Sequence, residues 1–85
     1  MPVSIMPVAF LSGYDRLGFV KVRELIRLIE SDGWRHVRTT GSHRHYKHSM
    51  KPNVVTVPGN LGDDIPIGTL KAILRSAALE AEHER

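Results

Sequence analysis

The stretch that decides the fold runs from Trp34 to Pro58 and reads WRHVRTTGSHRHYKHSMKPNVVTVP. It opens with WRHVRTT, a strand candidate rich in aromatic and β-branched residues, and continues with two further strand candidates, HRHYKHS and NVVTVP. The turn signals Gly41-Ser42 and Met50-Lys51-Pro52 separate the three segments. Because links this short join neighbouring strands in antiparallel order, the stretch predicts a three-stranded antiparallel sheet.

An amphipathic helix is predicted on each side of this stretch. From Val20 to Glu30 the apolar residues follow the i, i+3, i+4, i+7 spacing of one helix face, and Ser31-Asp32-Gly33 ends the pattern. A second helical pattern runs from Ile67 to Ala78. Both helices need an apolar surface to cover, so we predict an α+β fold of order α-β-β-β-α with both helices on one face of the sheet. This layout is that of a double-stranded-RNA-binding domain.

Length and composition limit the class of protein. The 85 residues have room for one domain, and the absence of cysteine excludes disulfides and zinc sites built from thiolates. The apolar N-terminal stretch is interrupted by Pro7 and lacks the charge and cleavage pattern of a signal peptide, and no apolar run is long enough to span a membrane. We therefore expect a soluble, cytoplasmic protein with no membrane partner.

The charge of the chain is unevenly distributed. Residues 33–62 contain five Lys or Arg residues and four His residues but no Asp or Glu. A surface formed by such a segment attracts phosphate backbones. It is equally compatible with a solvated face that only aids solubility.

The histidines of HRHYKHS are separated by strand alternation. Period 2 places His43, His45 and Lys47 on one face, and the other face, which holds Arg44, Tyr46 and His48, is expected to turn inward with Tyr46. Three interpretations compete for the outward set. The first is a zinc site, which requires three or four ligands that this register does not supply. The second is an ordinary solvated surface, in which these residues have no functional role. The third is acid-base chemistry on RNA, for which a histidine beside basic residues is suited.

Several motifs together resemble the HicA (YcfA-like) toxin family. They are the helix and turn ELIRLIESDGW, the triplet Gly41-Ser42-His43, Tyr46, the strand VTVP at Val55–Pro58, and IGTLKAIL at Ile67–Leu74. The resemblance implies a fold like that of double-stranded-RNA-binding domains and an activity as an mRNA interferase, a toxin that cleaves RNA and is neutralised by a HicB antitoxin. It places the domain at residues 20–80, between an extension at 1–19 and an acidic tail at 81–85.

The resemblance also assigns residues. The family's catalytic histidine falls on His43. We expect the side chains that hold RNA to be Ser42, Arg44, His45, Lys47, Arg38 and Lys51, and we expect no metal and no small-molecule cofactor. Members often carry a second histidine two residues after the proline of VTVP, and here Asn60 stands at that place. The rival hypothesis is a noncatalytic RNA-binding module that uses the same basic face.

Three further predictions concern single segments. Residues 1–19 are expected to be either a disordered extension or an upstream misreading of a start at Val20. Trp34 is expected to anchor the core rather than to stack on a base. The acidic tail is expected to be a solvated helix end, or a contact for the antitoxin.

Overall fold

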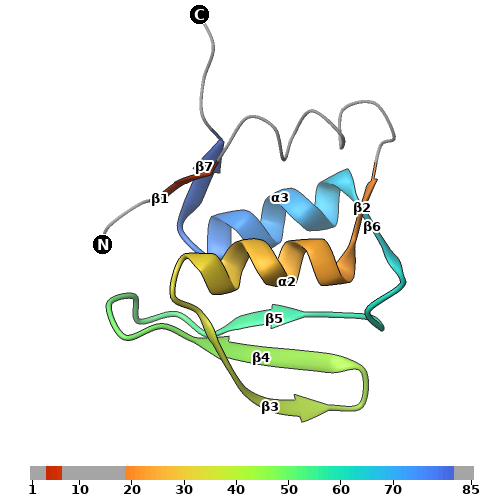
Figure 1. Cartoon of the computed structure of the whole chain (residues 1–85), viewed down its shortest axis with the longest axis horizontal. Coiled ribbons are helices and arrows are strands. Elements are labelled where there is room, and N and C mark those ends of the chain that lie inside the picture. Colours follow the sequence, from red (N-terminus) through yellow and green to blue (C-terminus); the bar gives the residue numbers. More distant parts are fainter. Residues whose placement is uncertain (1–3, 7–18, 82–85) are drawn as a thin grey trace, which may run out of the picture.

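Two helices lie on the same side of a three-stranded antiparallel sheet in the computed structural model, which describes residues 4–6 and 19–81 (Figure 1). The helices are α2 (Val22–Ser31) and α3 (Ile67–Ser76). The sheet has the order β3-β4-β5, formed by β3 (Arg35–Thr40), β4 (His43–Lys47) and β5 (Val55–Val57). The predicted α+β fold and its α-β-β-β-α order are confirmed.

The core lies between the helices and the inner face of β4 and β5. All four apolar residues of the predicted α2 face are buried: Val22, Leu25, Ile26 and Ile29. They meet Tyr46 of β4, Val55 and Val57 of β5, and Leu70 of α3. Trp34 is 1% exposed, so it is a core anchor as predicted. Burying a large apolar side chain contributes about 1.5–3 kcal/mol, so these contacts dominate the stability of so small a domain.

Strand β3 extends beyond the cover that the helices provide. All six of its residues are exposed, although it pairs with β4 along its length. The pairing register shifts between His36 and Arg38, and Val37 at this irregularity is 50% exposed. An irregularity of this kind bends the strand and increases its twist. The β3-β4 hairpin therefore presents basic side chains to solvent.

Two small strand pairs join the ends of the chain to the helices, and neither was predicted. β2 (Phe19–Lys21) pairs antiparallel with β6 (Asp64–Pro66), and β1 (Ser4–Met6) pairs parallel with β7 (Leu79–Ala81). Val20 thus belongs to a strand rather than to the predicted first helix. Segments of three residues are too short for period 2 to be visible in a sequence.

The loop between β5 and β6 completes the start of α2. The first amides of this helix have no partner within the helix, and the side chain at its N-cap makes no capping bond. Instead the Val22 N–H donates to the Asp63 carbonyl oxygen at 2.9 Å, and the Arg23 N–H donates to the Leu61 carbonyl oxygen at 3.1 Å. A segment some forty residues away in sequence therefore caps the helix.

The C-terminal part of the second helical pattern differs from the prediction. Helix α3 ends at Ser76, Ala78 has a φ of 53°, and the chain continues as β7. The expected helix end at the acidic tail is therefore wrong for Ala81, which belongs to β7, and residues 82–85 lie outside the described residues. Of the expected extension, Ser4–Met6 form β1 and Phe19 begins β2, while residues 1–3 and 7–18 also lie outside the described residues.

Neither described helix is long and apolar enough to cross a lipid bilayer.

Candidate active site

The register of β4 places its side chains as strand alternation predicts. Tyr46 is 2% exposed and packs in the core, whereas His43 and Lys47 are exposed. Burial raises the pKa of the Tyr46 phenol, the Glu30 carboxylate raises it further, and Arg44 lowers it. The alternating residues of β4 therefore divide into an inner group that holds the fold and an outer group that faces solvent.

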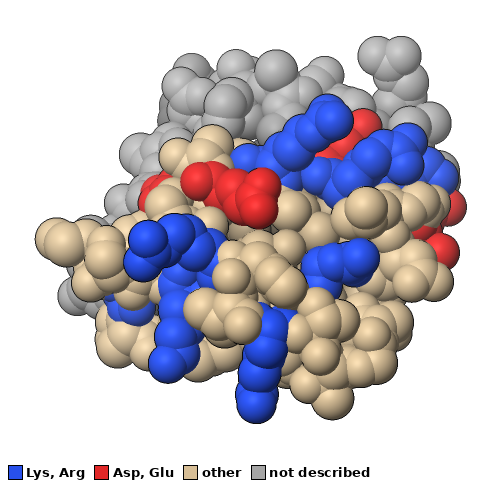
Figure 2. Space-filling model, turned by 60° about the horizontal axis from the view of Figure 1, so that its bottom comes forward, with Lys and Arg blue, Asp and Glu red and all other residues tan. Residues whose placement is uncertain are grey.

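Cross-strand pairing gathers basic residues on the outer face. Arg38 of β3 is opposite His45, Arg35 is opposite Lys47, and on the other side of β4 His45 is opposite Thr56 of β5. Residues paired in this way project to the same face of a sheet. In Figure 2 Lys and Arg side chains are spread over the lower part of the surface, where no Asp or Glu appears. The predicted basic patch is thus formed mainly by β3 and β4.

The turn between β3 and β4 presents His43 at the end of the hairpin. Gly41 has a φ of 61°, which favours glycine, and a Cβ there would meet nothing within 4 Å. Thr40 pairs with His43 directly after this turn, and Ser42 is exposed beside it. Within the described residues the His43 ring forms no hydrogen bond. Both of its ring nitrogens are therefore available to a ligand.

The other described histidines use their ring nitrogens inside the protein. His36 Nε2 lies 2.7 Å from Thr39 Oγ1, and His45 Nδ1 lies 3.0 Å from Thr56 Oγ1. The Met50 N–H donates to His48 Nδ1, so His48 Nε2 carries the proton and donates to the Asp32 carbonyl oxygen. His43 is therefore distinguished from the other described histidines by its free ring nitrogens, although His36 is exposed as well.

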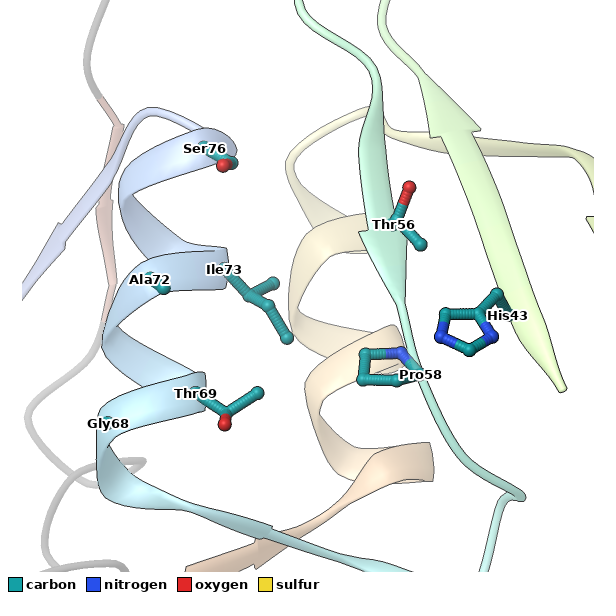
Figure 3. A pocket seen from close by; sticks show the side chains of 8 residues that line it. All are labelled: His43, Thr56, Pro58, Gly68, Thr69, Ala72, Ile73 and Ser76. Carbon is teal, nitrogen blue, oxygen red and sulfur yellow. The ribbon is translucent and has the colours of Figure 1, made fainter.

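His43 also lines an open cleft of about 470 Å³ between β5 and α3. On the sheet side the cleft is lined by His43, Thr56 and Pro58. On the helix side it is lined by Gly68, Thr69, Ala72, Ile73 and Ser76. Figure 3 shows the His43 ring directed toward Pro58, while Thr69 and Ile73 point toward β5 from the opposite wall. Sequence reasoning missed this cleft because its two walls come from segments that only the folded chain brings together.

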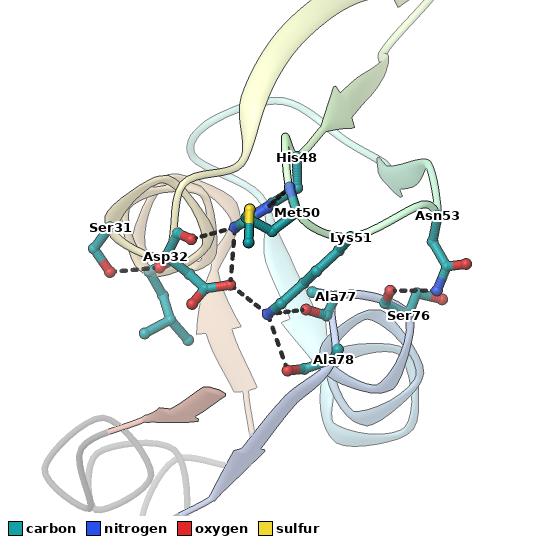
Figure 4. Close-up of polar contacts among 10 residues, drawn as sticks. Ser31, Asp32, His48, Met50, Lys51, Asn53, Ser76, Ala77 and Ala78 are labelled. Atoms are coloured by element: carbon teal, nitrogen blue, oxygen red, sulfur yellow. Dashed lines mark hydrogen bonds and ion pairs between the residues drawn. The ribbon is translucent and has the colours of Figure 1, made fainter. Parts of the chain in front are cut away.

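Two of the side chains predicted to hold RNA are engaged within the protein. Arg44 is half-buried on the inner side of β4, and its Nη1 donates to the Gly59 carbonyl oxygen at 3.0 Å. Lys51 is 4% exposed; its Nζ donates to Asp32 Oδ2 at 2.6 Å and to the carbonyl oxygens of Ala77 and Ala78 (Figure 4). The structure therefore brings His43, His45, Lys47, Arg38 and Ser42 to the outer face and hairpin end, but not these two.

Asn60, which stands at the place of the family's frequent second histidine, lies in the loop after β5. The residue is exposed, and its backbone N–H donates to Asp63 Oδ2 at 2.9 Å. It does not line the cleft beside His43. Among the described residues, no three His, Asp or Glu side chains are grouped so that they could hold a metal ion.

Comparison with known families identifies the class of protein. A family model described as HicA toxin of bacterial toxin-antitoxin matches residues 16–79, which is most of the chain. The chain belongs to the HicA toxin family. As a HicA toxin it is one half of a toxin-antitoxin pair, and its partner is an antitoxin. A search of curated proteins gave no significant match.

Proposed function

We propose that this HicA toxin is an endoribonuclease that cleaves mRNA in the cytoplasm and uses His43 as its general acid-base residue. The observation that carries the proposal is the state of the His43 ring. It is exposed, it forms no hydrogen bond within the described residues, and it stands between a basic sheet face and an open cleft. A histidine with free ring nitrogens can take a proton from a bound substrate or give one to it.

The chemistry requires a proton acceptor and a phosphate holder. A neutral His43 nitrogen takes the proton of a ribose 2′-hydroxyl, and the oxygen attacks the adjacent phosphorus. The bond from phosphorus to the 5′ oxygen breaks, and that oxygen takes a proton from the imidazolium or from water. Arg38 and the Ser42 hydroxyl hold the phosphate and stabilise its developing charge, and Lys47, at the other end of β4 from His43, holds a neighbouring phosphate of the RNA. The products are a 2′,3′-cyclic phosphate and a 5′-hydroxyl.

His45 has a supporting part in this proposal. Its Nδ1 lies 3.0 Å from Thr56 Oγ1, and in the sheet it pairs with Arg38 on one side and with Thr56, which lines the cleft, on the other. It contributes to the RNA surface mainly by shape and by holding Thr56. Arg44 and Lys51 are left out of the surface because their hydrogen bonds go to the protein.

Single-turnover cleavage of RNA tests the assignment. His43→Ala should lower the cleavage rate on the order of 100- to 10,000-fold while RNA affinity stays within a few-fold of wild type. His36→Ala is the matched control, since His36 is an exposed histidine of the same hairpin that bonds Thr39. Cleavage should persist in EDTA. Undiminished cleavage by folded His43→Ala protein would refute the role of His43.

The second candidate is a noncatalytic RNA-binding module. It is favoured by the outer face itself, which gathers Arg35, Arg38 and Lys47 without needing His43. Both candidates predict salt-sensitive RNA binding. A wild-type protein that binds RNA but leaves it intact, with and without EDTA, would select this alternative.

The proposed partner is a HicB-type antitoxin. If it neutralises the toxin by direct binding, the purified pair should form a stable complex and cleave no RNA. Cleavage at the free-toxin rate by the saturated complex would contradict this part of the proposal.

A further inference from the structure

We infer that the cleft between β5 and α3 holds the base of the nucleotide next to the scissile bond, so that the substrate must be unpaired at this position. The inference rests on the proposed function. His43 belongs both to the basic outer face and to the cleft wall. A ribose positioned at His43 therefore places its own base within reach of this cleft.

The chemistry of the lining suits a base rather than a phosphate. No Lys, Arg, Asp or Glu lines the cleft in the described part of the chain. Pro58 and Ile73 supply an apolar surface for the face of a ring, and the side chains of Thr56 and Thr69 carry hydroxyls. A phosphate would be drawn instead to Arg38 and Lys47 on the adjoining face. The RNA backbone and its base thus have separate sites on either side of His43.

The dimensions of the cleft select an unpaired nucleotide. Its volume of about 470 Å³ lies within the range of pockets that enclose small ligands. A base held in a duplex is stacked and paired, whereas single strands can splay a base into a pocket. Hydroxyls both donate and accept hydrogen bonds, so the lining accepts any of the four bases. The fold resembles a duplex-binding domain, but this cleft favours single-stranded RNA.

Narrowing the cleft tests the inference. Ala72 lines it and is exposed, so Ala72→Leu adds bulk without entering the core. Ser31→Leu is the matched control, since Ser31 is an exposed residue of α2 that does not line the cleft. The probe is a short, fluorescently labelled RNA pool of random sequence with 2′-fluoro riboses, which lacks the attacking hydroxyl. Ala72→Leu should weaken binding by about 5-fold, the lower end of the range for a base stacked on an aromatic ring, because Pro58 and Ile73 are aliphatic, and Ser31→Leu should not.

Cleavage of ordinary RNA by the same variants distinguishes a failure of the base site from a failure of the proposed ribonuclease activity. The inference is overturned, while the proposed function stands, if Ala72→Leu binds and cleaves as wild type does and His43→Ala still fails to cleave. If wild type does not cleave RNA at all, the proposed function fails, and an affinity loss confined to Ala72→Leu still supports a base site. Unchanged RNA binding together with loss of antitoxin binding would assign the cleft to the antitoxin and overturn the inference. Thr69→Leu, which adds bulk on the same wall, repeats the test if Ala72→Leu does not fold.

Discussion

Lys51 Nζ lies 2.6 Å from Asp32 Oδ2, and this ion pair ties together the ends of both helices. Asp32 is the C-cap of α2, while the same Nζ donates to the carbonyl oxygens of Ala77 at 3.1 Å and Ala78 at 3.2 Å, just past the end of α3. The C-terminal carbonyls of a helix carry partial negative charge. One buried ammonium therefore links the C-cap carboxylate of α2 to the carbonyl groups just past the end of α3, and we expect this contact to stabilise the fold.

Replacing Lys51 with Met should destabilise the protein. The change removes the ammonium that contacts Asp32 and two carbonyl groups, in a site where the lysine side chain is 2% exposed and the aspartate 15% exposed. We expect a loss of about 2–4 kcal/mol, somewhat less than the ~3–5 kcal/mol of a fully buried pair, because Asp32 remains partly exposed to solvent. Urea denaturation followed by Trp34 fluorescence measures it. Lys47→Met, at an exposed lysine, should cost no more than about 0.5 kcal/mol, and equal losses for the two variants would contradict the role of Lys51.

Gly33 should tolerate substitution less well than Gly41. Gly33 has a φ of 103°, and a Cβ there would come within 2.8 Å of His48 Nε2, the atom that donates to the Asp32 carbonyl oxygen. Gly33→Ala should therefore cost about 2–3 kcal/mol. Gly41→Ala meets no neighbour and should cost about 1 kcal/mol, from its positive φ alone. Thermal denaturation of the two variants measures both losses of stability. A larger loss for Gly41→Ala than for Gly33→Ala would contradict the prediction.

Stability should fall in alkaline solution because of Tyr46. Burial and the Glu30 carboxylate raise the pKa of this phenol above its ordinary value of 10.0. The stabilisation from the neutral phenol is complete below pH 10.0, and it is lost as the pH rises through the higher pKa of the folded state. Lysines also titrate there, so Tyr46→Phe is the comparison. The free energy of unfolding of the wild type should decrease more between neutral pH and pH values above 10.0 than that of Tyr46→Phe. Parallel pH profiles would show that Tyr46 does not contribute.

Arg38 and Lys47 should determine part of the salt dependence of RNA binding. Each phosphate contact to a single strand contributes about 0.7 to the slope of log K against log salt concentration. Arg38→Gln and Lys47→Gln should each lower the slope by that amount while weakening binding to all sequences alike. Arg27→Gln on the exposed surface of α2 is the control and should leave the slope unchanged. If Arg27→Gln changes the slope and the two sheet variants do not, the RNA binds to α2 and not to the sheet.

Much of the architecture was predictable from local signals. The 3.6-residue spacing of Val22, Leu25, Ile26 and Ile29 predicted a helix whose apolar face is buried, and the turn at Gly41-Ser42 separated two strands at the observed place. These signals work because each depends on residues only a few positions apart. The short strands β2 and β6 escaped prediction because their stability depends on a partner more than forty residues away.

In the candidate active site, too, some features follow from the sequence and others only from the fold. Strand alternation by itself determined that Tyr46 turns inward and that His43 and Lys47 face solvent, because side chains of a strand project to opposite faces in turn. Only the tertiary structure decided that His43 alone among the described histidines has an unengaged ring, that a cleft opens beside it, and that Lys51 is buried beneath both helix ends. Those properties depend on which distant segments meet, and packing between α3, β5 and the loop after β4 settles that only when the chain has folded.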